Sequence, residues 1–393
     1  MAELLLELAS EEIPARMQAR AAEELKRLVG EGLTGAGLSF AHAAAYATPR
    51  RLALVVKGLP KQQPDTTEER KGPKVGAPPQ AVEGFLKAAG LTSLDQAEVR
   101  ESDKGKVYFA VRRIKGRATA EVLPEILLAA IQAFSWPKSM RWAEGTLRWV
   151  RPLQGILALF DGKALAGSLP LGGGATLEFS GETRGHPMMG AKAIRPVCFS
   201  DYRAELARAH VILDPEKRRA LILEQAEAAA AEAGLTLRPD PALLDEVAGL
   251  VEWPVALVGA FDPAFLEVPP EILVTSMRSH QKYFALEDGD GRLASRFLLV
   301  ANVPAPEGST RRANIVAGNE RVLRARLSDA KFFWDQDRKT PLSERVPALG
   351  QIVFHAKLGT VDERVDRIEA LAVHLAQLLE GADADRVRAA ARL

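Results

Sequence analysis

The pattern of hydrophobic and polar positions predicts strands and helices that follow one another without a regular repeat. Leu4–Leu8 is a short apolar segment of strand length, and apolar residues recur at helical spacing after Pro14. Arg51–Lys57 is rich in Val and Leu and predicts a second strand. This order of strand, helix and strand predicts a small α+β segment over residues 1–62.

The region after residue 62 mixes both kinds of element. Lys61–Pro79 is rich in Pro, Lys, Gln and Glu without periodicity, and it predicts an exposed linker or long loop. Val107–Ile114 and Gly155–Phe160 have the composition of strands, and Val122–Phe134 that of an apolar helix. We therefore expect a multidomain α+β protein with mixed sheets and packed helices.

Local signals mark the ends of several elements. Asp214 and Asp240, each followed by proline, are expected to start helices, because Asp accepts from free N–H groups and proline at the first helical position loses no bond. Gly234 is expected to end the first of these helices. Tyr283–Leu286 and Phe297–Val303 predict a hairpin.

The chain is strongly helical from about Ala313. Thr360 and Glu363 form a capping box ahead of apolar residues at helical spacing, so a helical domain is predicted over residues 345–393. Residues 63–344 are predicted to form the central α+β module. The apolar face of the last helices has little partner material, so we expect the chain to stop inside a larger protein.

Composition restricts the class of protein. Among 393 residues, 52 basic and 51 acidic side chains leave a formal charge of +1, which excludes a uniformly basic nucleic-acid coat and leaves only local patches. The single cysteine, Cys198, excludes an internal disulfide framework and fits a reducing compartment, so a cytoplasmic location is expected. Neither a bilayer-spanning apolar run nor a signal peptide is recognisable, so no membrane contact is expected.

The densest unusual patch is Trp136–Pro152, which contains three of the five tryptophans. Its four cations, against one carboxylate, are Lys138, Arg141, Arg148 and Arg151. Cations between flat rings could clamp phosphates while an indole stacks on a base or a terminal ribose. Tryptophans that anchor the core, with the cations as a solvated rim, explain the same pattern. Composition slightly favours the second interpretation, and both stay open.

Two further polar patches are candidate binding sites. Arg184 and His186 lie on an expected loop and could hold a phosphate, or could belong to an ordinary turn. Ser276–Phe284 places a hydroxyl, an imidazole and two cations, Lys282 among them, between a helix and a strand, where side chains stay held but accessible. A nucleophile elbow and an acidic partner are both missing, so polar recognition is favoured over covalent catalysis.

Ligand spacing does not support metal chemistry. Asp288–Gly291 briefly resembles a calcium loop, but the twelfth position is Leu299, where a carboxylate is required. The six histidines lie far apart, with none in a ligand-spaced pair. We predict no metal site and no cofactor bound by this chain.

Gly318–Lys339 predicts a long helix. The residues of it expected to be mostly buried are Val322, Leu323, Leu327, Phe333 and Trp334. Lys331 and Asp335 share one face of it with two further polar residues. Salt bridges within the helix explain this face, and so do cations that meet an RNA backbone or a partner subunit.

Short runs spread over nearly the whole chain carry a family resemblance. They are Leu4–Pro14, Thr48–Leu54, Lys71–Pro73, Pro137–Trp142, Val150–Pro152, Arg184–His186, Leu250–Pro254, Gln281–Phe284, Gly318–Val322, Arg326–Ala330 and Leu358–Thr360. In this single order they closely resemble the β subunit of bacterial heterotetrameric glycyl-tRNA synthetase. The order makes the resemblance far more specific than any one motif.

The resemblance implies an aminoacyl-tRNA synthetase in which a class II α subunit makes glycyl-adenylate from glycine and Mg-ATP. The β subunit is then expected to bind and position glycine tRNA in an α2β2 assembly with the α subunit and a second β subunit. The resemblance also implies a module similar to the editing-module region of the phenylalanyl-tRNA synthetase large subunit, followed by the first helices of an HD-like domain. The family's β subunit is longer, so no ligase activity is expected of this chain alone.

Together these patterns predict a tRNA-binding and assembly subunit without catalytic residues of its own. The candidate tRNA contacts, chosen by charge and placement, are Arg50, Arg51, Lys138, Arg141, Arg148, Arg151, Arg184, His186 and Lys282. Two alternatives stay open. One is hydrolysis of mischarged tRNA by the region Ser276–Lys282, including His280, and the other is a purely structural module whose tryptophan patch is buried against another subunit or domain.

Overall fold

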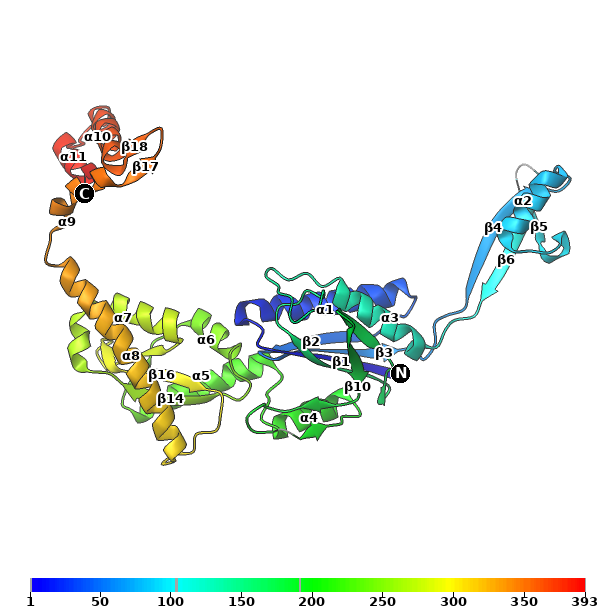
Figure 1. Cartoon of the computed structure of the whole chain (residues 1–393), viewed down its shortest axis with the longest axis horizontal. Coiled ribbons are helices and arrows are strands. Elements are labelled where there is room, and N and C mark those ends of the chain that lie inside the picture. The colour runs from blue at the N-terminus through cyan, green and yellow to red at the C-terminus, as the bar shows by residue number, and fades with distance from the viewer. Residues whose placement is uncertain (1, 103–104, 191, 393) are drawn as a thin grey trace. The chain divides into compact units, whose positions relative to one another are not determined.

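The computed structural model describes residues 2–102, 105–190 and 192–392 (Figure 1). Both helices and strands occur throughout, in agreement with the α+β class. Contacts between residues divide the chain into two compact units. The divisions between these units do not fall at residues 62 and 344, where the sequence pattern predicts them. Unit 1 comprises Met1–Ala229, Pro239–Leu257 and Val300–Glu307, and unit 2 comprises Ala230–Arg238, Val258–Leu299 and Gly308–Leu393.

The main sheet of unit 1 has seven strands in the order β2-β3-β1-β7-β10-β9, with β8 paired to β7. They are β1 (Ala2–Ser10), β2 (His42–Thr48), β3 (Arg51–Leu59), β7 (Leu153–Phe160), β8 (Lys163–Ala164), β9 (Ser168–Gly172) and β10 (Ala175–Ser180). All pairs are antiparallel except β7 with β10. Because β1 lies between β3 and β7, residues 1–62 share this sheet with residues 153–180 and do not form a segment of their own.

Both faces of this sheet are covered, since apolar residues occupy both sets of alternating positions in β1. Leu4, Leu6 and Leu8 pack in one core with α1 (Ala15–Gly35) and α3 (Thr119–Gln132). Leu5 packs in a second core with α4 (Phe199–Arg208), and Figure 1 shows α4 on the side of the sheet opposite to α1 and α3. Glu7 shares the face of Leu5, so the strand carries a carboxylate into the interior.

A second sheet of unit 1 has the order β4-β6-β5. Its elements are β4 (Thr66–Lys74), β5 (Glu98–Ser102), β6 (Gly105–Ile114), α2 (Pro79–Ala89) and the short 3-10 helix η1 (Leu94–Gln96). The prediction of an exposed linker or long loop at Lys61–Pro79 is therefore wrong. β6 supplies backbone partners to β4, whose side chains are mostly exposed, and Gly72 lets the Phe85 ring approach so closely that an added Cβ would lie 2.8 Å from it.

Helix-starting signals in unit 1 are confirmed. The Asp214 carboxylate accepts from the backbone N–H of Glu216 at 3.0 Å, at the start of α5 (Pro215–Glu232). Asp240 accepts from the N–H of Leu243 at 2.9 Å and caps α6 (Pro241–Ala248). Gly234, after α5, has a φ of 69°, in the left-handed region that glycine adopts without strain. The remaining strands of unit 1 are β11 (Thr183–Arg184) and β12 (Ala193–Ile194).

Unit 2 is built on a sheet with the order β13-β15-β16-β14. The elements around it are β13 (Thr236–Leu237), β14 (Val255–Ala260), η2 (Pro263–Glu267), α7 (Pro270–Ser276), the π-helical turn η3 (Met277–Gln281), β15 (Phe284–Glu287), β16 (Leu293–Ala301) and α8 (Thr310–Asp337). The expected hairpin is confirmed as β15 and β16. Leu323 and Leu327 of α8 are fully buried, whereas Val322 and Phe333 are 44% and 63% exposed, so the burial expected of these two is wrong.

The last part of unit 2 contains a small hairpin as well as helices. Its elements are α9 (Leu342–Arg345), η4 (Val346–Gln351), β17 (Val353–His355), β18 (Gly359–Thr360), α10 (Val361–Gln377) and α11 (Ala384–Arg392). The capping box of Thr360 and Glu363 is confirmed at the start of α10. Leu371 and Leu375 of α10 are exposed. The similarity to the phenylalanyl-tRNA synthetase module and to an HD-like domain stays a prediction.

Candidate nucleic-acid interface

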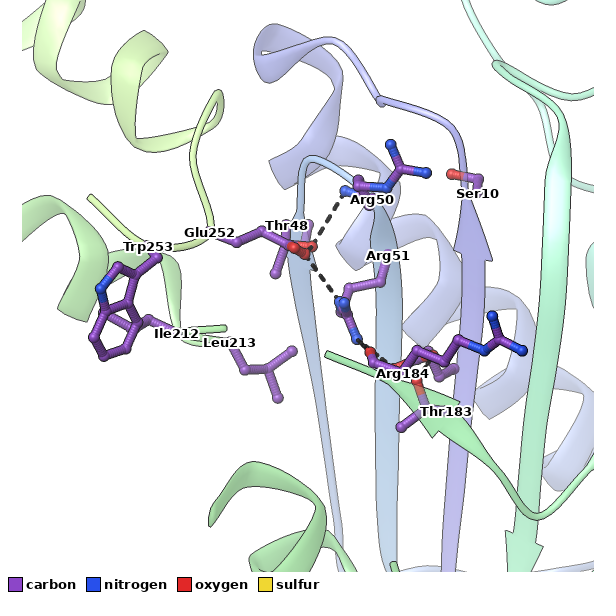
Figure 2. Close-up of polar contacts among 12 residues, drawn as sticks. Ser10, Thr48, Arg50, Arg51, Thr183, Arg184, Ile212, Leu213, Glu252 and Trp253 are labelled. Carbon is purple, nitrogen blue, oxygen red and sulfur yellow. Dashed lines mark hydrogen bonds and ion pairs between the residues drawn. The ribbon is translucent and has the colours of Figure 1, made fainter. Parts of the chain in front are cut away.

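Arg51 lies between two carboxylates in the interior of unit 1 (Figure 2). Its Nε donates to Glu252 Oε1 at 3.0 Å, and its Nη1 donates to Glu7 Oε2 at 3.1 Å. All three side chains are buried. Because removing charges from water is costly, such a cluster is stable only when pairing and hydrogen bonds satisfy it well.

Hydroxyl groups add hydrogen bonds to this buried charge cluster. Thr48 Oγ1 donates to Glu252 Oε1 at 2.6 Å, and the hydroxyls of Thr183 and Tyr202 donate to Glu7. Burial opposes the charged form of Glu252, but the charge of Arg51 and the hydrogen bonds outweigh it, so the pKa of Glu252 is lowered. Burial and the nearby Glu7 carboxylate raise the pKa of Tyr202 well above its ordinary value, so its hydroxyl stays a donor.

A second buried arginine, Arg218, holds the backbone around this cluster. Its guanidinium donates to four carbonyl oxygens, those of Ile212 (2.6 Å), Ala47 (2.7 Å), Leu213 (2.9 Å) and Ala248 (3.1 Å). Burial lowers the pKa of Arg218 to about 10, which leaves it charged at neutral pH. The contacts join the backbone just before Thr48 to that of Ala248, four residues before Glu252, and so they help to place Glu252 and the Thr48 hydroxyl that donates to it.

The cluster also supports the Arg184–His186 segment. Arg51 Nη1 donates to the backbone carbonyl of Arg184 at 3.2 Å. At Gly185 an added Cβ would lie 2.3 Å from the Cβ of Ala209, so only glycine lets the segment run this close to the end of α4. His186 is buried, and burial lowers its pKa.

A cleft of about 760 Å³ opens beside the cluster, lined by Ser10, Arg50, Gln154 and Arg184 among others. Figure 2 shows the guanidinium groups of Arg50 and Arg184 pointing away from the Arg51–Glu252 pair. Arg50 is paired with Glu11 at 3.2 Å. Arg184 is exposed, and its side chain has no ion-pair partner within the described ranges.

The segment 138–151 is anchored by aromatic rings. Trp149 is fully buried, and its ring contacts those of Phe134 and Trp136, with centroids 4.9 and 5.1 Å away, while Phe134 and Trp136 are 4.7 Å apart. Met140 and Trp149 exchange backbone hydrogen bonds of 2.8 and 3.1 Å, which close the loop. The interpretation of these rings as core anchors is confirmed for Trp149.

The cations of this segment are exposed and unpaired. Arg148 donates to the Ser139 hydroxyl at 3.2 Å, and Arg151 to the carbonyl of Val150 at 2.8 Å. Across the residues that the structure describes, Lys138, Arg141, Arg148 and Arg151 have no carboxylate within ion-pair distance. Other surface arginines do have one, such as Arg117, which pairs with Glu125 at 2.7 Å.

The nine residues predicted to contact tRNA differ in how far the structure exposes them. Arg51 and His186 are only 4% and 1% exposed, and the guanidinium of Arg51, a residue that lines the cleft, is held by Glu7 and Glu252, so burial argues against the direct contacts predicted for these two residues. Arg50, Lys138, Arg141, Arg148, Arg151 and Arg184 remain accessible in unit 1. Lys282 is half-buried in unit 2, with a φ of 60°. For these seven residues RNA contact stays a prediction.

The region Ser276–Lys282 shows no hydrolytic arrangement. It ends α7 and forms the π-helical turn, and within the described chain no hydrogen bond joins Ser276 or Ser279 to His280. Tyr283, which follows, donates to Asn319, and burial raises its pKa to about 12. In α8, Lys331 is paired with Glu267 at 2.7 Å and with Asp335 at 3.2 Å, so the salt-bridge interpretation is confirmed for this lysine.

Sequence reasoning missed the partners that bury Arg51. Glu7 carried a usable signal, because a single carboxylate within a run of leucines must find a partner if both faces of its strand are covered. Glu252 carried no such signal, apart from its position within Leu250–Pro254, one of the segments that carry the family resemblance. Among the described residues, no group of three or more His, Cys, Asp or Glu is placed to hold a metal ion, and no helix is both long and apolar enough to cross a bilayer.

Exposed, unpaired cations beside anchored aromatic rings on an α+β scaffold are typical of proteins that bind nucleic acid. Sequence comparison is more specific. Residues 4–393 match the family described as "Glycyl-tRNA synthetase beta subunit", and the chain belongs to this family.

Curated relatives agree with this assignment. The chain is 55% identical to the glycine–tRNA ligase beta subunit of Rhodospirillum centenum over 415 residues, covering 100% of the chain and 58% of the relative. It is 50% identical to that of Ruegeria sp. and 48% identical to that of Paracoccus denitrificans, in each case over 100% of the chain and 57% of the relative. The chain therefore spans just over half the length of these relatives.

Proposed function

We propose that this chain binds and positions glycine tRNA as part of a glycine–tRNA ligase, an enzyme of protein biosynthesis. The observation that carries the proposal is a set of exposed cations that have no carboxylate partner among the residues described, namely Lys138, Arg141, Arg148 and Arg151. Unpaired arginines can form charge-assisted hydrogen bonds to phosphate oxygens without first breaking an internal ion pair. The names of the relatives supply the substrate and the reaction class.

In this proposal the chain contributes position rather than chemistry. Glycine is activated with Mg-ATP on a partner α subunit, and the assembly contains two subunits of each kind. Holding the acceptor end of the tRNA near the activated glycine turns an encounter of two molecules into a step within one complex. The buried charge cluster keeps the cleft-lining Arg184 in place through its backbone carbonyl.

The test is a titration of labelled glycine tRNA with this chain over a salt series, with an unrelated tRNA alongside. The logarithm of the binding constant should fall linearly with the logarithm of the salt concentration. The slope should have a magnitude near 0.9 for each phosphate neutralised on a duplex and about 0.7 on a single strand. Tighter binding of glycine tRNA would show recognition as well as charge attraction. The absence of binding at low salt would contradict the proposal.

A further inference from the structure

A groove of about 350 Å³ in unit 1 combines cations with aromatic rings, and of its residues the proposed function uses only Lys138. It lies between the start of α1 and the segment that follows α3. Arg16 and Arg20 of α1 and Lys138 contribute its cations, and Phe134 and Trp136 line it with aromatic carbon. The sequence patterns drew no attention to Arg16 or Arg20.

The positive charge of this groove is only partly neutralised. Arg16 and Arg20 are exposed and one helical turn apart, and Arg16 has no ion-pair partner in the described part of the chain. The carboxylate that also lines the groove is Glu24, which is held by Arg27 through hydrogen bonds of 2.8 and 2.9 Å. The first turn of α1 contains no acidic residue, so the positive end of the helix adds to the attraction for an anion.

The aromatic wall is rigid. Phe134 is buried and stacks on Trp136 with an interplanar angle of 29°. Trp136, which is half-exposed, also makes an edge-to-face contact with the buried Trp149, at an interplanar angle of 75°. A base that stacks on such a preorganised ring loses little side-chain freedom on binding.

The same two rings also line a neighbouring hollow of about 460 Å³, where Gln132, Ser139 and Arg148 supply polar groups. Cations are therefore present in both hollows that the aromatic wall borders, Arg16 and Arg20 in one and Arg148 in the other. Rings flanked by cations in this way are typical of surfaces that follow single-stranded nucleic acid.

We infer that this groove binds an unpaired nucleotide of an RNA, with the base against Phe134 and Trp136 and the flanking phosphates against Arg16, Arg20 and Lys138. The inference rests on the proposed function and adds a site and a ligand class to it. A volume of about 350 Å³ is at the small end of the usual range of about 300–1,000 Å³ for ligand sites, so it suits one nucleotide. In a duplex the base faces are stacked on one another and cannot reach the rings.

The test measures binding of short RNAs to the whole chain at low salt. The probes are labelled pentaadenylate and pentauridylate, a blunt RNA duplex closed by a linker, and AMP, with glycine tRNA titrated in parallel. Both pentamers should bind more tightly than the duplex and than AMP, and they should quench tryptophan fluorescence. The Trp136→Phe variant should lose most of the quenching, because it keeps a ring but removes the reporting indole.

Charge variants locate the site. The double variant Arg16→Gln/Arg20→Gln should weaken pentamer binding about tenfold and lower the salt slope by about one to two units, since the slope falls by roughly one for each phosphate that is no longer neutralised. Arg117→Gln is the matched control, because Arg117 is an arginine of unit 1 that is already paired with Glu125 at 2.7 Å and lines neither hollow. It should bind the pentamers as the unchanged chain does.

Each other outcome overturns the inference, and the outcomes differ in what happens to the proposed function. If glycine tRNA binds with a steep salt slope while the Arg16/Arg20 double variant behaves like the unchanged chain, the groove is not an RNA site and the proposed function stands. If neither tRNA nor pentamers bind, both fail. AMP binding as tight as that of the pentamers would indicate a mononucleotide site instead. Tryptophan fluorescence that responds to added α subunit and not to RNA would indicate a protein interface.

Discussion

Two arginine-rich regions of unit 1 differ in what surrounds each guanidinium group. In the buried charge cluster, Arg51 is held by Glu7 and Glu252, and the nearby Arg218 by four backbone carbonyls. In the segment 138–151, Arg141 and Arg148 are exposed and have no carboxylate partner among the described residues. The same residue type therefore stabilises the fold in one region and stays available to an anion in the other, and its partners decide which.

The largest effect is expected from removing a partner of the buried Arg51. Glu252→Ala should lower the free energy of unfolding by about 3–5 kcal/mol, because it leaves a buried guanidinium uncompensated. Urea unfolding followed by circular dichroism measures the change. Glu125→Ala, which breaks the exposed pair with Arg117, is the control and should cost less than about 1 kcal/mol. Equal costs for both variants would show that burial does not distinguish the two kinds of arginine.

Arg218→Ala should come next, at about 3 kcal/mol, because carbonyl oxygens buried without donors carry their full desolvation cost. Arg218→Lys should recover only part of the loss, since a single ammonium cannot serve four carbonyls as a planar guanidinium does. The neighbouring Arg219 is half-exposed and paired with Asp245 at 2.6 Å, and so provides the matched control. If Arg219→Ala unfolds as easily as Arg218→Ala, the backbone contacts of Arg218 are not what stabilises this region.

Stability should also depend on pH through the buried cluster. Burial lowers the pKa of His186 in the folded state, opposed in part by Glu252 and reinforced by His210 and Arg51. Below the unfolded pKa of about 6.5, the unfolded chain takes up a proton that the folded chain resists, so stability falls as the pH drops, by at most about 1.4 kcal/mol per unit for one group. The lowered pKa of Glu252 adds a second loss below about pH 4.5.

Thermal unfolding of the His186→Asn variant tests the first of these losses. As the pH falls from about 7 to 5.5, the stability of the variant should decline less steeply than that of the unchanged chain. His42→Asn replaces an exposed histidine and should keep the original decline. An unchanged slope in the His186 variant would assign the pH dependence to other groups.

The smallest effect on stability is expected in the exposed segment. Arg141→Ala and Arg151→Ala should change the free energy of unfolding by less than about 0.5 kcal/mol. They should nevertheless weaken tRNA binding and lower its salt slope by about one unit for each phosphate that is no longer neutralised. Arg117→Ala, which removes an arginine already paired, should leave the slope unchanged. A slope that stays the same in the Arg141 and Arg151 variants would contradict the proposed interface.

Elements with local causes could be predicted from the sequence. The caps at Asp214, Asp240 and Thr360 depend on residues two or three positions away, and all three are confirmed. The strand Thr66–Lys74 could not be predicted in this way, because its partner β6 begins 31 residues after it ends and its own side chains are polar and exposed. Its backbone pairing rather than its composition makes it a strand.

The candidate site was predictable in part. Composition identified the cations of the segment 138–151. The structure then places them on the surface. It could not separate Arg50 from Arg51, since neighbouring residues in an extended chain point to opposite sides and the sequence does not say which side is covered. It also missed Arg16 and Arg20, because two arginines at the start of a helix become notable only once Phe134 and Trp136 lie beside them.

The amino-acid sequence by itself determined the local elements, the class of fold and the family, because these depend on short-range chemistry and on the order of motifs. Only the tertiary structure decided which charges are paired. Arg51 and Glu252 are 201 positions apart in the chain, and Glu7 and Thr183 are 176 apart. Such pairs form only after the sheet and α4 exclude water from the space between them, and that exclusion is what makes one arginine structural and leaves another free to bind.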